Sequence, residues 1–208
     1  MPDFELEDKY NNFSVVGIDE AGRGPWAGPV VAGAVIIKDH NLDEFLLKTL
    51  NDSKKLTAKK RESLYEKLFE AQKSGKIKIG IGQASAEEID QYNILQATFM
   101  AMNRAVSSLG IKPEFALVDG NQVPKGICCN CQTVVKGDSK CYSISAASII
   151  AKVFRDHLMA DLAKKYPYYG FEKNAGYGTK AHIEGLEKHG IIKGIHRLSY
   201  KPIQKFVK

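Results

Sequence analysis

The sequence has no long apolar run, and it does not begin like an exported protein. Charged residues interrupt the chain too often to leave the roughly 18 consecutive apolar residues that a membrane-spanning helix needs. The first residues, MPDFELEDKYNNF, are acidic where an export signal has basic residues followed by an apolar segment. We therefore expect a soluble, cytoplasmic protein with no membrane partner.

Cysteines are few, and they are confined to one short region. Cys128, Cys129, Cys131 and Cys141 lie close together, unlike the widely spread cysteines of a disulfide-bonded secreted domain. We expect reduced thiols. A structural zinc site is the alternative, but the sequence lacks the paired Cys-x-x-Cys motifs and the histidine spacing of common zinc modules. The role of the cluster therefore stays open.

Positive charge is concentrated in the last quarter of this 208-residue chain, whose net charge is +6. Residues 1–156 carry 20 basic and 20 acidic side chains, whereas residues 157–208 carry ten basic and four acidic ones. A second basic cluster lies in the neutral part: Lys54, Lys55, Lys59, Lys60 and Arg61. Two separated positive patches favour a nucleic-acid partner, because phosphates attract Lys and Arg. A solvated helix face is the simpler alternative for either patch.

Hydrophobic patterning predicts a mixed α/β fold. Runs rich in Val and Ile predict five strands, at 15–19, 29–37, 76–84, 115–120 and 132–137. Helical periodicity is found at 64–69, 89–106 and 143–165. Ser85 and Glu88 can form a capping box at the start of the second of these helices.

The connections between these elements predict the architecture. A short turn joins the first two strands, which favours antiparallel pairing, whereas helices separate the later strands. We predict a mixed five-stranded sheet flanked by helices, with a helical, basic C-terminal extension. Residues 1–170 would form the catalytic domain, and residues 171–208 would pack on it as part of one structural unit.

Acidic residues near glycines stand at the ends of three of the predicted strands: Asp19 and Glu20, Asp119, and Asp138. Strand ends form the binding crevice of α/β sheets, and carboxylates buried there need a partner. Mg²⁺ and Mn²⁺ prefer such oxygen ligands, and two of these ions together can promote phosphodiester hydrolysis. An ordinary turn or helix-capping role is the alternative for any single carboxylate, above all for Asp138.

The pair Asp19 and Glu20 presents a geometric difficulty, because neighbouring residues of a regular strand point to opposite faces. We therefore expect an irregular strand end, for which Gly22 and Gly24 supply backbone freedom. The same loop, with Arg23 between the two glycines, suits close approach to a sugar or a phosphate. The Gly-Lys-Ser or Gly-Lys-Thr of a nucleotide-binding loop is absent, so ATP chemistry is unsupported.

Seven motifs follow one another along nearly the whole chain: GIDEAGRGP (17–25), NDSKKL (51–56), LVDGN (117–121), VVKGDS (134–139), SISAASIIAKVFRD (143–156), GYGTKAH (176–182) and HRLSY (196–200). In this order they resemble the bacterial ribonuclease HII family. The resemblance implies an RNase H-like sheet with a helical C-terminal extension. It also implies hydrolysis on the 5′ side of a ribonucleotide, in RNA/DNA hybrids or in duplex DNA carrying single ribonucleotides, which leaves 3′-hydroxyl and 5′-phosphate ends.

The resemblance assigns roles to particular residues. Four carboxylates correspond to the metal-binding and catalytic set, which holds two Mg²⁺ or Mn²⁺ ions in the active complex: Asp19, Glu20, Asp119 and Asp138. The loop that recognises the ribose 2′-hydroxyl corresponds to Gly22, Arg23 and Gly24. Tyr177 corresponds to the tyrosine that packs on the sugar at the RNA-to-DNA junction, and Lys54 and Lys55 lie in a segment near the nucleic-acid groove.

Two other functions are compatible with the sequence. One is a non-catalytic nucleic-acid binding module that uses the basic C-terminal segment, and the other is a nuclease of the same fold that cuts branched DNA. The absence of a heptad repeat favours a monomer.

Three histidines are spaced seven residues apart, at His182, His189 and His196. Gly190 and Gly194 interrupt the helical pattern between the last two, so the spacing need not place all three on one face. We expect surface or capping histidines here rather than a row of ligands.

Overall fold

One five-stranded sheet with the strand order β3-β2-β1-β4-β5 forms the centre of the computed structural model, which describes residues 2–10, 13–50 and 56–207. The strands are β1 (Val15–Ala21), β2 (Val30–Ile37), β3 (Ile77–Ala84), β4 (Phe115–Asp119) and β5 (Asn130–Val134). β1 pairs antiparallel with β2 and parallel with β4, and β5 is parallel to β4. The predicted mixed sheet and its antiparallel first pair are therefore confirmed.

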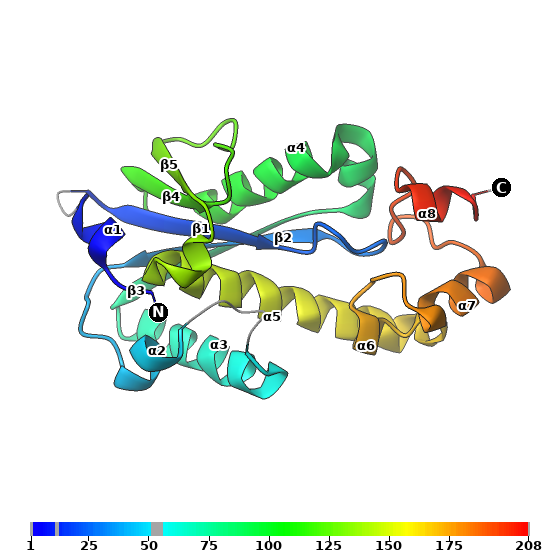
Figure 1. Cartoon of the computed structure of the whole chain (residues 1–208), viewed down its shortest axis with the longest axis horizontal. Helices are drawn as coiled ribbons and strands as arrows, with labels where there is room; N and C mark the ends of the chain where they lie inside the picture. Colours follow the sequence, from blue (N-terminus) through cyan, green and yellow to red (C-terminus); the bar gives the residue numbers. More distant parts are fainter. Residues whose placement is uncertain (1, 11–12, 51–55, 208) are drawn as a thin grey trace.

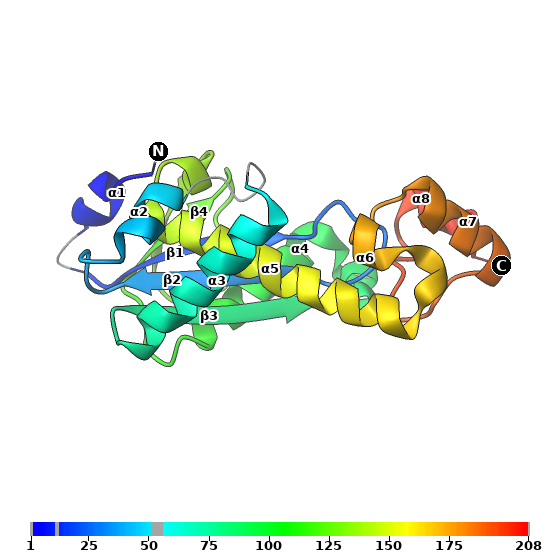
Figure 2. The same cartoon turned by 90° about the horizontal axis from the view of Figure 1, so that it is seen from below.

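Helices cover both faces of the sheet. α4 (Ala86–Ser107) packs on one face and α5 (Tyr142–Lys165) on the other, where α3 (Ala58–Lys73) joins it (Figures 1 and 2). The remaining helices are short: α1 (Glu5–Asp8), α2 (Glu44–Thr49), α6 (Phe171–Asn174), α7 (Lys180–His189) and α8 (Lys201–Gln204). The described residues also contain two 3₁₀ turns, η2 (Gly137–Ser139) and η3 (Pro167–Tyr169).

Small residues let α5 lie directly against the sheet. An added Cβ at Gly17 would overlap the main chain at Ser143 and Ile144, and one at Gly33 would overlap the main chain at Ala147. This close approach places the first turns of α5 against β1. Ser148, on α5, thereby contacts the first of the strand-end carboxylates.

α4 begins as predicted but contains an unpredicted break. The Ser85 hydroxyl accepts the Glu88 N–H, and the Glu88 carboxylate accepts the Ser85 N–H, so the capping box is confirmed. Asn93 adopts a positive φ of 67° inside the helix. Its side-chain oxygen accepts the N–H groups of Leu95 and Gln96, and thereby caps the second part of the helix.

The last strand is shorter than the predicted 132–137. It ends at Val134, because Lys136 takes a left-handed conformation (φ 58°) and the chain turns into η2. Asp138 therefore lies in a 3₁₀ turn just beyond the strand.

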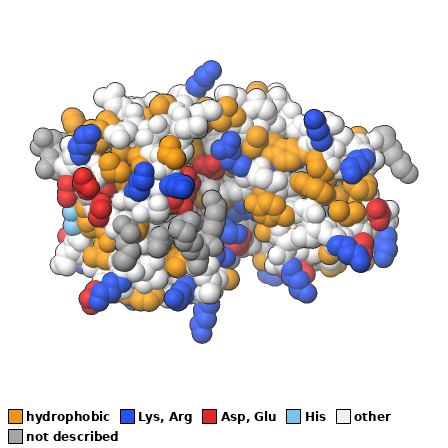
Figure 3. Space-filling view, in the orientation of Figure 1, with side chains coloured by type: hydrophobic (Ala, Val, Ile, Leu, Met, Phe, Trp, Pro, Cys, Tyr) orange, Lys and Arg blue, Asp and Glu red, His pale blue; other side chains and the backbone are white. Residues whose placement is uncertain are grey.

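The C-terminal extension is helical, as predicted, and lies beyond one end of the sheet (Figure 2). It packs on the end of α5 through a separate apolar cluster: Ala27, Met159, Ala163, Tyr169, Phe171, Leu186 and Ile203. Lys and Arg side chains are distributed over its surface in Figure 3. Across the described ranges, no helix combines the length and apolar character needed to span a bilayer.

Candidate active site

Parallel pairing of β1 with β4 brings the strand-end carboxylates together. Ile18 is paired with Val118, so Asp19 and Asp119 follow side by side at the same end of the sheet. Asp119 Oδ1 accepts the N–H of Gly137 at 2.7 Å. This bond ties Asp119 to η2, the turn that carries the buried Asp138. The predicted convergence at one sheet edge is thus present for the strand-borne carboxylates, with Asp138 on the adjoining turn.

Asp19 lies in an environment that opposes its negative charge. Its exposed fraction is only 6%. Burial, followed by the nearby carboxylates of Glu20 and Asp119, holds the pKa of Asp19 well above its ordinary value. A hydrogen bond from Ser148 and one from the Glu20 N–H at 2.7 Å act in the opposite direction. A buried cluster of this kind is stabilised by a cation.

The donor set fits a hard divalent cation. Within residues 2–10, 13–50 and 56–207, no three His, Cys, Asp or Glu side chains are grouped closely enough to hold a metal ion by themselves. Mg²⁺ sites, however, commonly use one or two carboxylates and complete their coordination with water and substrate phosphate. The oxygen donors at Asp19, Glu20 and Asp119 match that chemistry, whereas a zinc site would favour His or Cys.

The expectation of an irregular strand end at Asp19 and Glu20 is wrong. β1 keeps regular antiparallel register through both residues, with Asp19 opposite Gly33 and Glu20 opposite Ala32. Asp19 contacts Ser148 on the α5 face, whereas Glu20 lines a pocket on the α4 face. Both carboxylates can still serve one site because they stand at the rim of the sheet, where its two faces meet.

The backbone becomes irregular one residue beyond β1, at Gly22. Its φ is +95°, and an added Cβ would overlap the Arg155 side chain, so only glycine fits. Arg23 is half-exposed and forms an ion pair with Glu20 at 3.3 Å. The glycine loop Gly22-Arg23-Gly24 therefore begins directly beside the carboxylates.

Two buried arginines, Arg155 and Arg197, bind main-chain carbonyls in and around the glycine loop. The sequence reasoning did not single out either of them. Arg197 donates from Nη2 to the Gly22 carbonyl (2.6 Å), from Nη1 to the Arg23 carbonyl (2.9 Å) and from Nε to the Gly28 carbonyl (3.0 Å). Arg155 donates to three other carbonyls, those of Ala27, Pro29 and Ala175. Both arginines lie within the motifs that carry the family resemblance, and this position is the sequence signal that could have identified them.

Tyr177 lies against the glycine loop. A tight turn presents it, with Ala175 at φ 48° and Gly176 at φ 86°. A Cβ at Gly24 would be only 3.4 Å from Tyr177 Cε1, so the ring lies against Gly24. The side chain remains 51% exposed, which leaves ring surface available to a ligand. The structure therefore brings the predicted loop and the predicted tyrosine together.

These residues line two neighbouring pockets. A pocket of about 450 Å³ is lined by the glycine loop and by Glu20, Ala21, Arg61, Ser148, Lys152, Arg155 and Tyr177. A smaller one of about 110 Å³ shares Glu20 and Arg23 and extends to Asp119 and Gly120. Arg61 and Lys152 add positive charge to the walls. Lys54 and Lys55 lie outside the described residues, so their predicted role stays a prediction.

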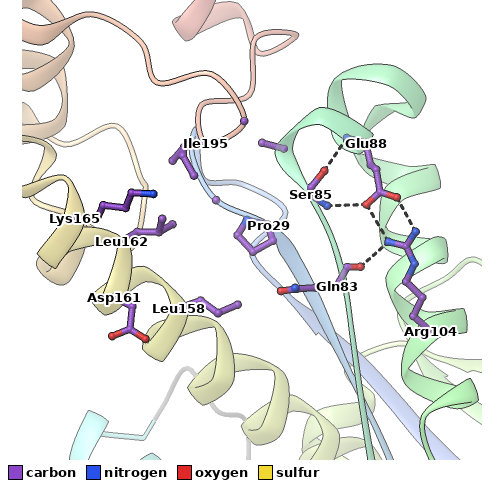
Figure 4. Close-up of a pocket in the computed structure, with 13 residues that line it drawn as sticks. Pro29, Gln83, Ser85, Glu88, Arg104, Leu158, Asp161, Leu162, Lys165 and Ile195 are labelled. Atoms are coloured by element: carbon purple, nitrogen blue, oxygen red, sulfur yellow. Dashed lines mark hydrogen bonds and ion pairs between the residues drawn. The ribbon is translucent and has the colours of Figure 1, made fainter.

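A separate cavity of about 510 Å³ lies between α4, α5 and the C-terminal segment (Figure 4). Leu158, Leu162 and Ile195 form apolar walls, and the Glu88–Arg104 ion pair (2.6 Å) lies on the α4 side. Its lining includes none of the predicted site residues.

Cys128, Cys129 and Cys131 lie at the start of β5, whereas Cys141 precedes α5 and donates its N–H to the Gly137 carbonyl. All four thiols are free: Cys128 is exposed, Cys129 and Cys131 are partly buried, and Cys141 is buried. Burial raises the pKa of Cys129 to about 12, and the neighbouring Cys131 adds to the effect. A thiol that stays protonated at neutral pH is a poor nucleophile.

An RNase H-like sheet with carboxylates at the ends of adjacent strands, beside a groove that carries basic side chains, defines a metal-dependent nuclease. A family model described as Ribonuclease HII matches residues 16–203. A ribonuclease HII of Wolbachia sp. subsp. Brugia malayi is 49% identical over 202 residues, which cover 97% of this chain and 94% of that protein. The chain belongs to the ribonuclease HII family, whose members are endoribonucleases that use divalent metal ions.

Solved structures agree with this assignment. The ribonuclease H2 of Pyrococcus horikoshii OT3 superposes with a TM-score of 0.75 at 31% identity, covering 92% of this chain and 96% of that one. A Bst-RNase HIII in complex with Mn²⁺ also has a TM-score of 0.75, covering 92% and 68% of the two chains. At 17% identity, that second likeness establishes the fold alone.

Proposed function

We propose that this protein hydrolyses the phosphodiester on the 5′ side of a ribonucleotide, in RNA/DNA hybrids or in duplex DNA carrying single ribonucleotides. The products would carry 3′-hydroxyl and 5′-phosphate ends. The observation that carries the proposal is the shared groove, in which strand-end carboxylates lie beside the glycine loop and Tyr177. The enzyme would act as a monomer in the cytoplasm, where bacterial DNA is located.

The carboxylates are arranged for metal-assisted hydrolysis. Asp19, Glu20, Asp119 and Asp138 would hold two Mg²⁺ or Mn²⁺ ions, which supply Lewis-acid chemistry when bound. The chain fixes its own oxygens beforehand: Ser148 and the Glu20 N–H orient Asp19, and the Gly137 N–H orients Asp119. Such preorganisation avoids reorienting the ligands during the reaction. Arg61 and Lys152 would bind backbone phosphates along the groove.

Recognition of the ribose would come from the loop and the tyrosine. Gly22 sets the path of the loop beside Arg155, and the absence of a side chain at Gly24 permits close approach of a nucleotide to the main chain. A 2′-hydroxyl both donates and accepts hydrogen bonds and distinguishes RNA from DNA at such a contact. The exposed face of Tyr177 provides an apolar platform for the adjacent sugar.

The test compares wild type with Asp138→Asn on a duplex containing one ribonucleotide, with Mg²⁺ or Mn²⁺ present. Asp138→Asn should reduce cleavage at least about 100-fold, because a ligand of the metal loses its charge. Duplex binding, measured by gel shift, should survive. Asp161→Asn, which changes an exposed carboxylate on α5, is the matched control and should cleave normally.

An all-DNA duplex and a branched DNA separate the alternatives. Wild type should cut only the ribonucleotide-containing strand, on the 5′ side. Binding without any metal-dependent cleavage would favour the non-catalytic module, and cutting of the branched DNA would favour the other substrate class. Normal cleavage by Asp138→Asn would refute the assigned carboxylate set.

A further inference from the structure

Two histidines of the C-terminal segment are buried and bonded to one another. His182 is 0% exposed and His196 is 1% exposed, and their Nε2 atoms lie 3.1 Å apart. The expectation of surface or capping histidines is therefore wrong for this pair, although His189 is exposed. Aromatic rings surround the two imidazoles: Trp26, Tyr169 and Phe171.

Main-chain groups at both ends of the pair fix where its protons lie. The Ile192 N–H, which can only donate, points to His196 Nδ1 at 2.8 Å, so neutral His196 carries its proton on Nε2. That proton is donated to His182 Nε2, and His182 then carries its own proton on Nδ1. The Tyr177 carbonyl, which can only accept, lies 3.0 Å from His182 Nδ1. Both ends therefore require the same arrangement.

This arrangement holds only while both rings are neutral. A second proton on either ring would place two N–H donors against each other, either between the rings or at Ile192. Burial lowers the pKa of His182, and burial together with His182 lowers the pKa of His196 to about 4. The series of hydrogen bonds that runs from the Ile192 N–H through both rings to the Tyr177 carbonyl is therefore intact at neutral pH.

This series of hydrogen bonds ends at the main-chain carbonyl of Tyr177, the tyrosine of the candidate substrate groove. We propose that His182 is a positioning residue that holds Tyr177 against Gly24 for recognition of the ribonucleotide, and that His196 fixes the His182 tautomer this requires. The inference rests on the proposed function of Tyr177. His182 lies beneath the turn and does not line the groove, so it acts through Tyr177.

The first experiment is independent of activity. Nitrogen-15 NMR of the imidazoles in the whole protein at neutral pH distinguishes protonated from unprotonated ring nitrogens. We expect His182 protonated on Nδ1 only, which is the less common tautomer, and His196 protonated on Nε2 only. The reverse tautomers, or a charged ring, would overturn the proposal.

The second experiment measures kcat and KM on the single-ribonucleotide duplex. His182→Leu removes the side-chain donor to the Tyr177 carbonyl, which keeps the Thr179 N–H at 2.8 Å, and should lower kcat/KM about 10-fold. His182→Asn retains an N–H near the Nδ1 position and should recover to within about threefold of wild type. His189→Leu, on the same helix but away from the turn, is the control and should match wild type. Thermal melting establishes that each variant is folded at the assay temperature.

A double-variant cycle separates positioning from general structural damage. In a Tyr177→Ala background, His182→Leu should change kcat/KM less than twofold, because the group it positions is gone. An undiminished 10-fold effect in that background, or failure of His182→Asn to rescue, would refute the proposal. If wild type itself cleaves no ribonucleotide substrate, the proposed function fails, and the NMR result alone decides the histidine arrangement.

Discussion

Replacement of Arg197 by lysine should weaken the fold more than its conservative chemistry suggests. The guanidinium contacts three carbonyls through three different nitrogens, at 2.6 Å to Gly22, 2.9 Å to Arg23 and 3.0 Å to Gly28. A lysine presents its donors from one nitrogen and cannot span all three. In such a variant the Arg23 carbonyl keeps a second donor, the Tyr200 hydroxyl at 2.6 Å. The carbonyls of Gly22 and Gly28 lose the hydrogen bonds that Arg197 donates to them.

The magnitude follows from the carbonyls that would be left without a donor. A buried polar group without its partner costs about 1–3 kcal/mol. Arg197 and Gly28 are both buried, so water does not readily replace the hydrogen bond to the Gly28 carbonyl. The buried positive charge remains in Arg197→Lys, and its desolvation is not relieved. With one or two carbonyls left unpaired, we expect the free energy of unfolding to fall by about 2–4 kcal/mol.

Urea unfolding of the metal-free protein measures this loss. At a typical slope of about 2 kcal/mol per molar urea, the midpoint should fall by about 1–2 M with the slope unchanged. Arg104→Lys, at a partly exposed arginine that pairs with Glu88, is the control and should lose less than about 1 kcal/mol. An Arg197→Lys protein that unfolds within about 0.5 kcal/mol of wild type would refute the anchoring role.

Two further predictions concern charge. Asp19→Asn in EDTA should melt about 2–4 °C above wild type, since it removes repulsion with Glu20 and Asp119 while keeping an acceptor for the Glu20 N–H; a lower melting temperature would contradict this. Because the pKa of His196 falls from 6.5 to about 4 on folding, the unfolded chain binds a proton between those values that the folded chain does not. The free energy of unfolding should therefore decrease by about 2–3 kcal/mol as pH falls from 7 to 4.5, and His196→Gln should flatten that decrease, as urea unfolding at both pH values would show.

The strands and the position of the candidate site were predictable from local patterns in the sequence. Val and Ile runs placed the strands because buried strands need continuous apolar side chains. The acidic residues after those runs located the candidate site, since strand ends converge at a sheet edge. The break at Asn93 and the early end of β5 at Lys136 were missed, because each depends on one residue adopting a positive φ that composition does not reveal.

The buried polar residues were not predictable for a different reason. Arg197 and His182 look like surface residues in sequence, but both are buried in the fold. Main-chain carbonyls distant in the chain satisfy Arg197, whereas the nearby Tyr177 carbonyl and the His196 ring satisfy His182. The partners of Arg197 come into reach only once the C-terminal segment has packed on residues 26–28. Sequence pattern reports which residues are apolar, but it carries no information on which carbonyls remain unpaired in the folded chain.

His196 and Arg197 are consecutive, and they support opposite sides of the candidate sugar-binding region. His196 acts through His182 on the Tyr177 carbonyl, whereas Arg197 binds the carbonyls of Gly22 and Arg23. The Arg197 N–H also donates to the Trp26 carbonyl, which fixes this dipeptide to the chain that follows the glycine loop. A shift of the dipeptide would therefore move the tyrosine and the loop together and preserve their spacing. The carboxylates are positioned by β1, β4, η2 and α5, and α5 also supports the loop and the tyrosine through Arg155, which lies against Gly22 and binds the Ala175 carbonyl.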